Sequence, residues 1–464
     1  MKTILLVLAI TLAGSPFSVR ADVVDDYIRA EMARQGIAGL AIAVTRDGRI
    51  ERAEGYGVAN LEHKVPVHPD TLFKSGAVGM QLTAAAVMLL VEDDKIDLDE
   101  PVRKYLPEIP VSWQPVTIRQ LLNHTSGIPA TPNGDFRADY TDEQLLGIIT
   151  KQDLNFAAGS RWRFSYAGYI LLGFVVKRVT GDYYGDLLSR RVFAPLGMRT
   201  ARPIDELAII PNRASGYELR EKGLQNAEWI SPTANSTADG SLYLSALDYA
   251  AWDAGMATGR ILKPASWAEI ARPARMTGGC LHPYGFGWYQ EKMGGQNVWS
   301  HSGSWQGFQT FAIRFLGDHL TVAVFANSDN ADPALIARHV AGLLDPKLVE
   351  SPASPKADGD PKMKARAAKL LGDIVAERAR YAEFVDYAQL DFDELMAMYK
   401  RTLSGLGPLQ DIALFDRKAA CGETRYRYRA RYGQGVVEAR LAIASDGRIG
   451  DLEIVPVAAW DAPL

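Results

Sequence analysis

The sequence predicts an α+β protein: an antiparallel sheet flanked by helices, followed by a small C-terminal α+β domain. Three observations support this. Residues 80–91 are apolar on almost every face, which is typical of a helix buried in a large domain. Residues 40–56 and 310–326 each show two strand patterns joined by a short polar turn. A polar, proline-rich linker at 346–361 separates the two parts.

The first 21 residues predict a signal peptide. A basic residue, Lys2, precedes an apolar run at 4–13 and a small-residue exit at Ala21, so cleavage is expected before Asp22. That apolar run is too short to cross a bilayer, and no later stretch is long and apolar enough. We therefore expect an exported protein, periplasmic or secreted, with no membrane span.

Composition and charge argue against nucleic-acid binding. The 464 residues are 47% hydrophobic and 23% charged, which is ordinary for a globular protein. Removing residues 1–21 takes away Lys2 and Arg20 and no acidic residue, so the formal charge changes from −4 to −6. There is also no long basic run.

Cysteine and histidine usage gives little sign of a disulfide framework or a metal site. Cys280 and Cys421 are either two free thiols or one bridge between the main domain and the tail, and both readings stay open. The seven histidines lack the paired spacing of metal ligands, so we expect neither a metal nor another cofactor.

The main domain is predicted to cover residues 22–345. Apolar residues at helical spacing predict its first helix, and a turn at Arg46-Asp47-Gly48 joins its first two strands. The elements expected in order are a helix at 23–35, strands at 40–44 and 49–56, helices at 80–91, 116–122 and 246–256, strands from 284 to 326, and a closing helix at 333–344.

The C-terminal domain is predicted to cover residues 362–464. Its pattern is a helical lead followed by a four-stranded meander: helices at 363–377 and 392–402, then strands at 409–415, 424–431, 436–444 and 452–457. This order resembles small cystatin-like or NTF2-like domains. It carries no catalytic motif, so we expect it to pack against the main domain or to bind a protein partner.

A segment at 73–87 carries the resemblance that suggests a function. It resembles the first active-site segment of the serine β-lactamase and penicillin-binding-protein superfamily, in the branch of class C β-lactamases, D-aminopeptidases and esterases. That branch usually reads Phe-Arg-Ile-Gly-Ser-Val-Thr-Lys. The alignment places Ala77 at the nucleophilic Ser and Met80 at the Lys. A methyl group cannot attack a carbonyl, and a thioether cannot accept the proton.

A second segment, 159–173, resembles the Tyr-Ser-Asn motif of the same branch. Phe164 takes the place of the Tyr and Tyr166 that of the Asn, while Ser165 is kept. The Tyr is the branch's usual proton shuttle, and Phe164 has no hydroxyl. Shifting the register to make Tyr166 the shuttle loses the match at 168–173.

A third segment, 299–308, fits the branch's His-Thr-Gly or Lys-Thr-Gly strand, with Ser302 at the Thr. The resemblance implies that the backbone N–H groups of Ala77 and Ser304 point where relatives have an oxyanion hole. The residues predicted to contact a ligand are His301, Ser304, Tyr166 and Trp305.

Other nucleophile candidates are weak. The run His124-Thr125-Ser126-Gly127 is typical of a structural turn. Lys74 and Ser75 are neighbours that point apart on an extended chain, as are His301 and Ser302. Ser165 beside Tyr166 is the least unfavourable alternative.

The resemblance implies a beta-lactamase/transpeptidase-like sheet with an all-helical subdomain over roughly residues 25–345. With the Ser-x-x-Lys and Tyr-x-Asn motifs lost, we expect an exported, non-hydrolytic pseudoenzyme that binds a peptide, cell-wall fragment or acyl ligand. The alternative is a serine hydrolase or acyltransferase with a rearranged nucleophile. A third reading is an interaction protein that works through residues 363–464.

Overall fold

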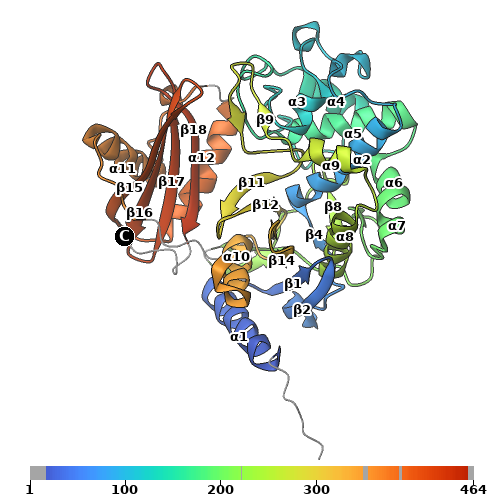
Figure 1. The fold of residues 1–464 in the computed structure, drawn as a ribbon, viewed down its shortest axis with the longest axis horizontal. Coiled ribbons are helices and arrows are strands. Elements are labelled where there is room, and N and C mark those ends of the chain that lie inside the picture. Colours follow the sequence, from blue (N-terminus) through green and yellow to red (C-terminus); the bar gives the residue numbers. More distant parts are fainter. Residues whose placement is uncertain (1–16, 221, 349–353, 386–388, 458–464) are drawn as a thin grey trace, which may run out of the picture.

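The computed structural model describes residues 17–220, 222–348, 354–385 and 389–457 (Figure 1). The predicted α+β architecture is confirmed. The main domain is built on a seven-stranded antiparallel sheet with the order β11-β12-β13-β14-β1-β2-β3. Its strands are β1 (Gly39–Arg46), β2 (Arg49–Asn60), β3 (Val65–Pro66), β11 (Tyr289–Met293), β12 (Gln296–Trp305), β13 (Phe308–Phe315) and β14 (Leu320–Ala326).

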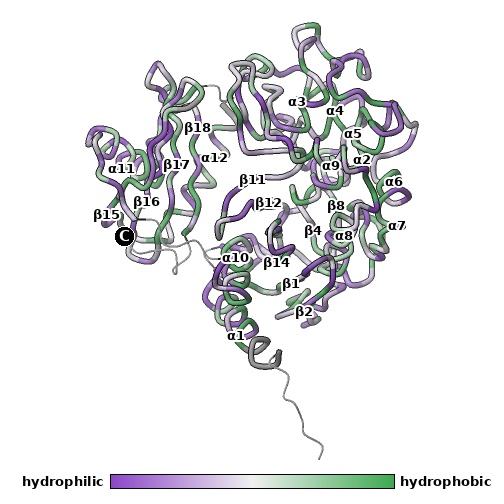
Figure 2. The backbone as a smooth tube through the Cα atoms, viewed as in Figure 1, coloured by the Kyte–Doolittle hydropathy of each residue, from purple (hydrophilic) through white to green (hydrophobic). Residues whose placement is uncertain are grey.

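One face of this sheet is covered by helices α1 (Phe17–Gln35) and α10 (Pro333–Leu344). Both alternate hydrophobic and hydrophilic residues along their length, so each presents one apolar side to the sheet (Figure 2). Their buried residues form one core with the sheet, including Ile28, Ile336, Ile42 and Val322. The predicted closing helix has the bounds expected from the sequence.

The opposite face supports the helical subdomain and the central helix α2 (Met80–Glu92). Every residue of α2 from Met80 to Leu90 is buried, as its sequence predicts. Around α2 lie α3 (Ile118–Leu122), α4 (Asp142–Thr150), α5 (Tyr166–Thr180), α6 (Tyr184–Leu188), α8 (Ala246–Thr258) and α9 (Pro264–Ile270). A 3₁₀ turn, η1 (Gly76–Gly79), leads directly into α2.

A small three-stranded sheet that the sequence did not predict holds the entrance to α2. Strand β4 (Phe73–Lys74) pairs with β8 (Leu242–Leu244), and β8 also pairs with β5 (Arg202–Pro203). Strands of two or three residues leave no periodic pattern, so only the tertiary contact reveals them. They fix the segment that enters η1.

The C-terminal domain has its own sheet, with the order β15-β16-β17-β18, and its own core. Its strands are β15 (Leu409–Ala420), β16 (Glu423–Tyr432), β17 (Gly435–Ile443) and β18 (Ile449–Val457), with helices α11 (Pro361–Val375) and α12 (Gln389–Ser404). The core contains residues of both helices and of all four strands. The predicted helical lead and meander are therefore present.

Cys280 and Cys421 form a disulfide, which settles the alternative left open by the sequence. Cys280 lies between strands β9 (Ala274–Arg275) and β10 (Leu281–His282) of the main domain, and Cys421 lies in the turn between β15 and β16. The bridge therefore ties the C-terminal sheet to a hairpin of the main domain.

Residues 1–16, most of the predicted signal peptide, lie outside the described residues, and α1 begins at Phe17. Among the described helices, none has the length and apolar character needed to cross a membrane.

Candidate active-site cleft

Two glycines let the segment before α2 touch strand β12. Gly76 has a φ of +50°, and a Cβ on it would lie 2.6 Å from the Ser304 nitrogen. A Cβ on Gly303 would lie 2.1 Å from the Ser75 carbonyl oxygen and 3.0 Å from the Ala77 nitrogen. Neither contact leaves room for a side chain. Ala77 and Ser304 therefore belong to two segments in direct backbone contact, which is the arrangement a pair of amide donors requires.

The side chains at the start of α2 offer no nucleophile. Ala77 is 3% exposed and Met80 is fully buried. The neighbouring hydroxyl, Ser75 Oγ, is also buried and donates a hydrogen bond of 2.8 Å to the Gly240 carbonyl oxygen. The Ser75 carbonyl oxygen in turn accepts a hydrogen bond of 2.7 Å from Thr310 Oγ1. This serine is part of the packing below the turn.

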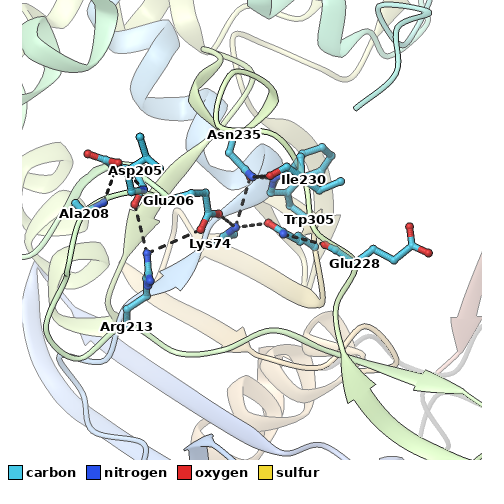
Figure 3. A network of polar contacts seen from close by, with 11 residues as sticks. Lys74, Asp205, Glu206, Ala208, Arg213, Glu228, Ile230, Asn235 and Trp305 are labelled. Carbon is cyan, nitrogen blue, oxygen red and sulfur yellow. Dashed lines mark hydrogen bonds and ion pairs between the residues drawn. The ribbon is translucent and has the colours of Figure 1, made fainter. Parts of the chain in front are cut away.

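Lys74 lies in a buried polar network on the other side of that turn (Figure 3). Its ammonium group forms an ion pair with Glu206 and donates hydrogen bonds to the side chains of Gln306 and Asn235. Trp305 Nε1 donates to the same Asn235 Oδ1 at 2.5 Å. Burial lowers the pKa of Lys74, and the Glu206 carboxylate opposes that shift. Lys74 is thus bound to Glu206 and does not contact the Ser75 hydroxyl.

A second buried network connects two histidines through Tyr284. His124 Nδ1 accepts a hydrogen bond of 3.1 Å from the Ser165 backbone N–H, so its Nε2 carries the proton and donates to the Tyr284 hydroxyl at 3.1 Å. His301 Nδ1 lies 2.6 Å from the Ser302 carbonyl oxygen and must donate to it. Its Nε2 therefore accepts the Tyr284 proton at 3.0 Å. Both rings are neutral, and all four ring nitrogens are hydrogen-bonded.

Keeping His301 neutral makes stability depend on pH. Burial lowers the pKa of His301 from 6.5 to about 4, so the unfolded chain takes up this proton first as the pH falls. The stabilisation is fully present above pH 6.5 and is lost between pH 6.5 and 4, at about 1.4 kcal/mol per pH unit. We expect urea unfolding, measured across this pH range, to show that the free energy of unfolding falls less steeply with decreasing pH in His301→Gln than in the wild type. The reason is that the variant lacks the titrating imidazole. Equal slopes would contradict this assignment.

The second motif contributes packing and a helix cap. The Phe164 ring packs 4.3 Å from the ring of His124, 4.9 Å from Tyr166 and 5.9 Å from His301, measured between centroids. An aromatic hydrocarbon thus occupies the position that the motif alignment assigns to the proton shuttle, and Tyr166 is half-buried beside it.

Ser165 caps helix α5. Its Oγ accepts a hydrogen bond of 3.1 Å from the Gly168 N–H and donates one of 2.8 Å to the Pro129 carbonyl oxygen. The side chain is 1% exposed. A hydroxyl used in this way stabilises the helix start and has no general base among its hydrogen-bond partners.

A cavity of about 500 Å³ lies next to Trp305. The Phe136 ring lines it and packs edge-on against Trp305 at 5.8 Å. An ion pair of 2.8 Å between Arg137 and Glu228 also borders it. The remaining lining residues are Thr131, Asn133, Gly134, Asp135 and Ile230. The cavity offers room for a small ligand beside the Phe136–Trp305 pair.

The predicted ligand-contact residues are brought together only in part. Ser304 is exposed and Trp305 is half-buried beside the cavity, whereas His301 is buried behind them with both nitrogens bonded. The ligand-binding role of His301, Ser304, Tyr166 and Trp305 stays a prediction. Sequence reasoning missed Tyr284, which lies 17 residues before His301 and 160 after His124 and carries no motif.

Comparison with known proteins decides the family. The profile described as Beta-lactamase matches residues 24–345. The chain belongs to the beta-lactamase family. Among curated relatives of this beta-lactamase-family chain, a penicillin-binding protein of Bacillus subtilis (strain 168) is 26% identical over 308 residues, covering 62% of this chain and 68% of the relative. A D-aminopeptidase of Gluconobacter oxydans (strain 621H) is 26% identical over 317 residues, covering 66% and 59%.

Solved structures of the family share the fold. The octameric penicillin-binding protein homologue from Pyrococcus abyssi matches with a TM-score of 0.63 and 21% identity, covering 94% of this beta-lactamase-family chain and 98% of that chain. A D-amino acid amidase from Ochrobactrum anthropi SV3 matches with a TM-score of 0.61 and 24% identity, covering 71% and 98%. At these identities the likeness concerns the fold alone.

Proposed function

We propose that this beta-lactamase-family protein is an exported pseudoenzyme that binds a peptide, cell-wall fragment or acyl ligand without hydrolysing it. The observation that carries the proposal is the start of α2, where Ala77 and Met80 are buried carbon and sulfur side chains. Acyl transfer needs an attacking hydroxyl and a nearby proton acceptor, and this position supplies neither.

The hydroxyl and imidazole groups of the neighbouring residues also support the absence of hydrolytic activity. The hydroxyls of Ser75 and Ser165 both donate to backbone carbonyl oxygens, and His301 uses both ring nitrogens. The rearranged-nucleophile alternative needs one of these groups, and each already has structural partners. Export is supported by the disulfide between Cys280 and Cys421, since such bridges persist in oxidising compartments.

Ligand binding is supported by features that do not depend on the lost side chains. The contact between Gly76 and Gly303 keeps the amides of Ala77 and Ser304 on adjoining segments, where two N–H groups can hold a carbonyl oxygen. Phe136, which packs against Trp305, lines a cavity of about 500 Å³. The named relatives include penicillin-binding proteins, a D-aminopeptidase and a D-amino acid amidase, which favours a peptide or amide ligand.

The test is a binding experiment in which the ligand is recovered afterwards. We expect titration with N-acetylated D-alanyl-D-alanine to give saturable binding followed by tryptophan fluorescence, with the peptide recovered intact after prolonged incubation. Trp305→Leu is expected to weaken binding about tenfold, because the indole packs against Phe136, which lines the cavity. Trp229→Leu is the matched control, since Trp229 is 58% exposed. Cleavage of the peptide, or equal effects of the two variants, would contradict the proposal.

A further inference from the structure

A second cavity, of about 520 Å³, lies where α3, α9 and strand β9 meet. It shares no lining residue with the cavity beside Phe136. Its volume is in the range of small-molecule sites in proteins. The lining residues are Asp99, Arg119, Gln120, Asn123, Gly159, Glu269, Arg272, Pro273, Arg275, Met276, Thr277 and Phe286. Most of them carry polar side chains, so the hydrogen bonds that each one already makes decide what the cavity can hold.

Asn123 brings a buried amide donor to this cavity. The residue is 5% exposed, and its Oδ1 accepts a hydrogen bond of 2.7 Å from Thr125 Oγ1. Its Nδ2 donates to no residue in the described part of the chain. Buried side-chain amides are nearly always paired at both ends, so an open amino group on the wall of a cavity indicates a missing acceptor.

Gln120 adds a second open amide donor. Its Oε1 accepts a hydrogen bond of 3.0 Å from the Thr117 N–H in the capping box of α3, whereas its Nε2 donates to none of the described side chains or carbonyl groups. Gly159, with a φ of +80°, lets this Nε2 come close. A Cβ on Gly159 would lie 2.9 Å from Gln120 Nε2 and 3.0 Å from Thr277 Oγ1. The Gln120 amide and the Thr277 hydroxyl therefore meet at one point of the cavity wall.

The carboxylates of the cavity already have arginine partners. Arg119 donates two hydrogen bonds, of 2.6 and 2.9 Å, to Asp99 and also forms an ion pair with Glu269. Glu269 pairs in addition with Arg272, at 2.9 Å. Arg275 lines the same cavity and forms an ion pair with no described residue. Among the charged side chains that line the cavity, one guanidinium group therefore lacks a carboxylate partner.

We propose that this amide-lined cavity binds the carboxylate group of a small organic acid or of a peptide C-terminus. Carboxylate oxygens only accept hydrogen bonds, and the open groups of Asn123, Gln120 and Arg275 only donate them. A hydrogen bond from a guanidinium group to a carboxylate is among the strong ones. One such group matches a single negative charge and leaves a phosphate dianion half neutralised. The site goes beyond the cleft function proposed above and does not rest on it.

Apolar side chains complete the cavity and make an aromatic acid a suitable probe. Phe286 is 2% exposed and Met276 is 7% exposed, so both present only a small apolar face to the cavity. Benzoate offers a flat ring to these walls and a carboxylate to the amide donors. Benzamide has the same shape without the charge, which makes it the matched neutral probe.

The test is calorimetric titration of the full-length, disulfide-bonded protein with sodium benzoate, with sodium chloride at matched ionic strength as the reference. We expect saturable binding with a stoichiometry near one. Benzamide and sodium phosphate are each expected to bind about tenfold more weakly, because neither matches one negative charge with acceptor oxygens. N-acetylglycylglycine represents a peptide C-terminus. Tighter binding of this peptide than of benzoate identifies a peptide ligand, and the reverse order identifies a free organic acid.

Two variants with matched controls test the donors. Gln120→Glu keeps an oxygen for the capping box and turns the open donor into a carboxylate, so we expect it to weaken benzoate binding at least about tenfold. Gln114→Glu makes the same charge change at an exposed position outside the cavity and should bind as the wild type does. Arg275→Gln is expected to weaken binding about tenfold, and Arg49→Gln, an exposed position on β2, should have no effect.

A crystal structure with 4-bromobenzoate locates the ligand directly. We expect the bromine anomalous signal in the amide-lined cavity, with the carboxylate within hydrogen-bond distance of Asn123 Nδ2. Three results would overturn the proposal. They are the absence of saturable binding of both carboxylates, equal losses of affinity in the cavity variants and their controls, and a bromine signal found only in the cleft beside Trp305.

Discussion

Replacing Ala77 with Ser and Met80 with Lys together is expected to destabilise the protein strongly and to restore no hydrolytic activity. Met80 is fully buried at the first position of α2, within a helix whose residues are buried as far as Leu90. A lysine there becomes a buried ammonium group without a designed partner, which costs about 3–5 kcal/mol. Urea unfolding measures this loss. Met80→Leu is the control and should cost less than about 1.5 kcal/mol.

We expect the double variant to lack hydrolytic activity for a reason that is separate from its stability. The ring at the shuttle position, Phe164, has no hydroxyl to pass the proton to a leaving group. His301 cannot take over, because its Nε2 accepts the Tyr284 proton and its Nδ1 donates to a backbone carbonyl oxygen. Turnover of nitrophenyl esters by Ala77→Ser alone and by the double variant measures this. Ready acylation of the double variant would show that the second motif is dispensable.

Replacing Glu206 with Gln is expected to cost about 3 kcal/mol, because it leaves Lys74 without its carboxylate. The Lys74 side chain is 6% exposed, so water cannot replace the lost partner. Gln306 and Asn235 accept hydrogen bonds from Lys74 but carry no charge. Because Trp305 Nε1 shares the Asn235 oxygen with Lys74, loss of the Glu206 carboxylate should also alter tryptophan fluorescence.

A double-mutant cycle distinguishes this buried pair from an exposed one. Combining Lys74→Met with Glu206→Gln should recover most of the stability, since the stranded charge is removed. Glu228→Gln breaks the ion pair with Arg137, in which both side chains are 64% exposed, and should cost less than about 1 kcal/mol. A cost below 1 kcal/mol for Glu206→Gln, or no recovery in the double variant, would contradict the buried-pair assignment.

Features set by local sequence were predictable. The central helix α2, the closing helix α10 and the meander of the C-terminal domain each follow from hydrophobic periodicity within a short window. Strand order in the large sheet was not predictable from periodicity, because β1 pairs with β14 across almost 300 residues. The short strands β4, β5 and β8 leave no pattern to recognise.

In the candidate site, too, contacts that a motif marks were predictable, and contacts between residues far apart in the chain were not. The motif alignment predicted that the segments of Ala77 and Ser304 would meet, and the two glycines show how closely they do. The partners of Lys74 and the bridge made by Tyr284 come from positions far apart in the chain, and no motif links them. The bridge between Cys280 and Cys421 stayed open for a related reason, since two cysteines carry no information on their distance.

The central claim is that no side chain in the cleft forms an acyl adduct. Intact-protein mass spectrometry after exposure to a fluorescent penicillin and to a nitrophenyl ester tests it most directly. We predict an unchanged mass with both reagents at every time point, because the position that the motif alignment assigns to the attacking oxygen holds the methyl group of Ala77. A stoichiometric mass increase that maps to a residue lining the cleft would contradict the account.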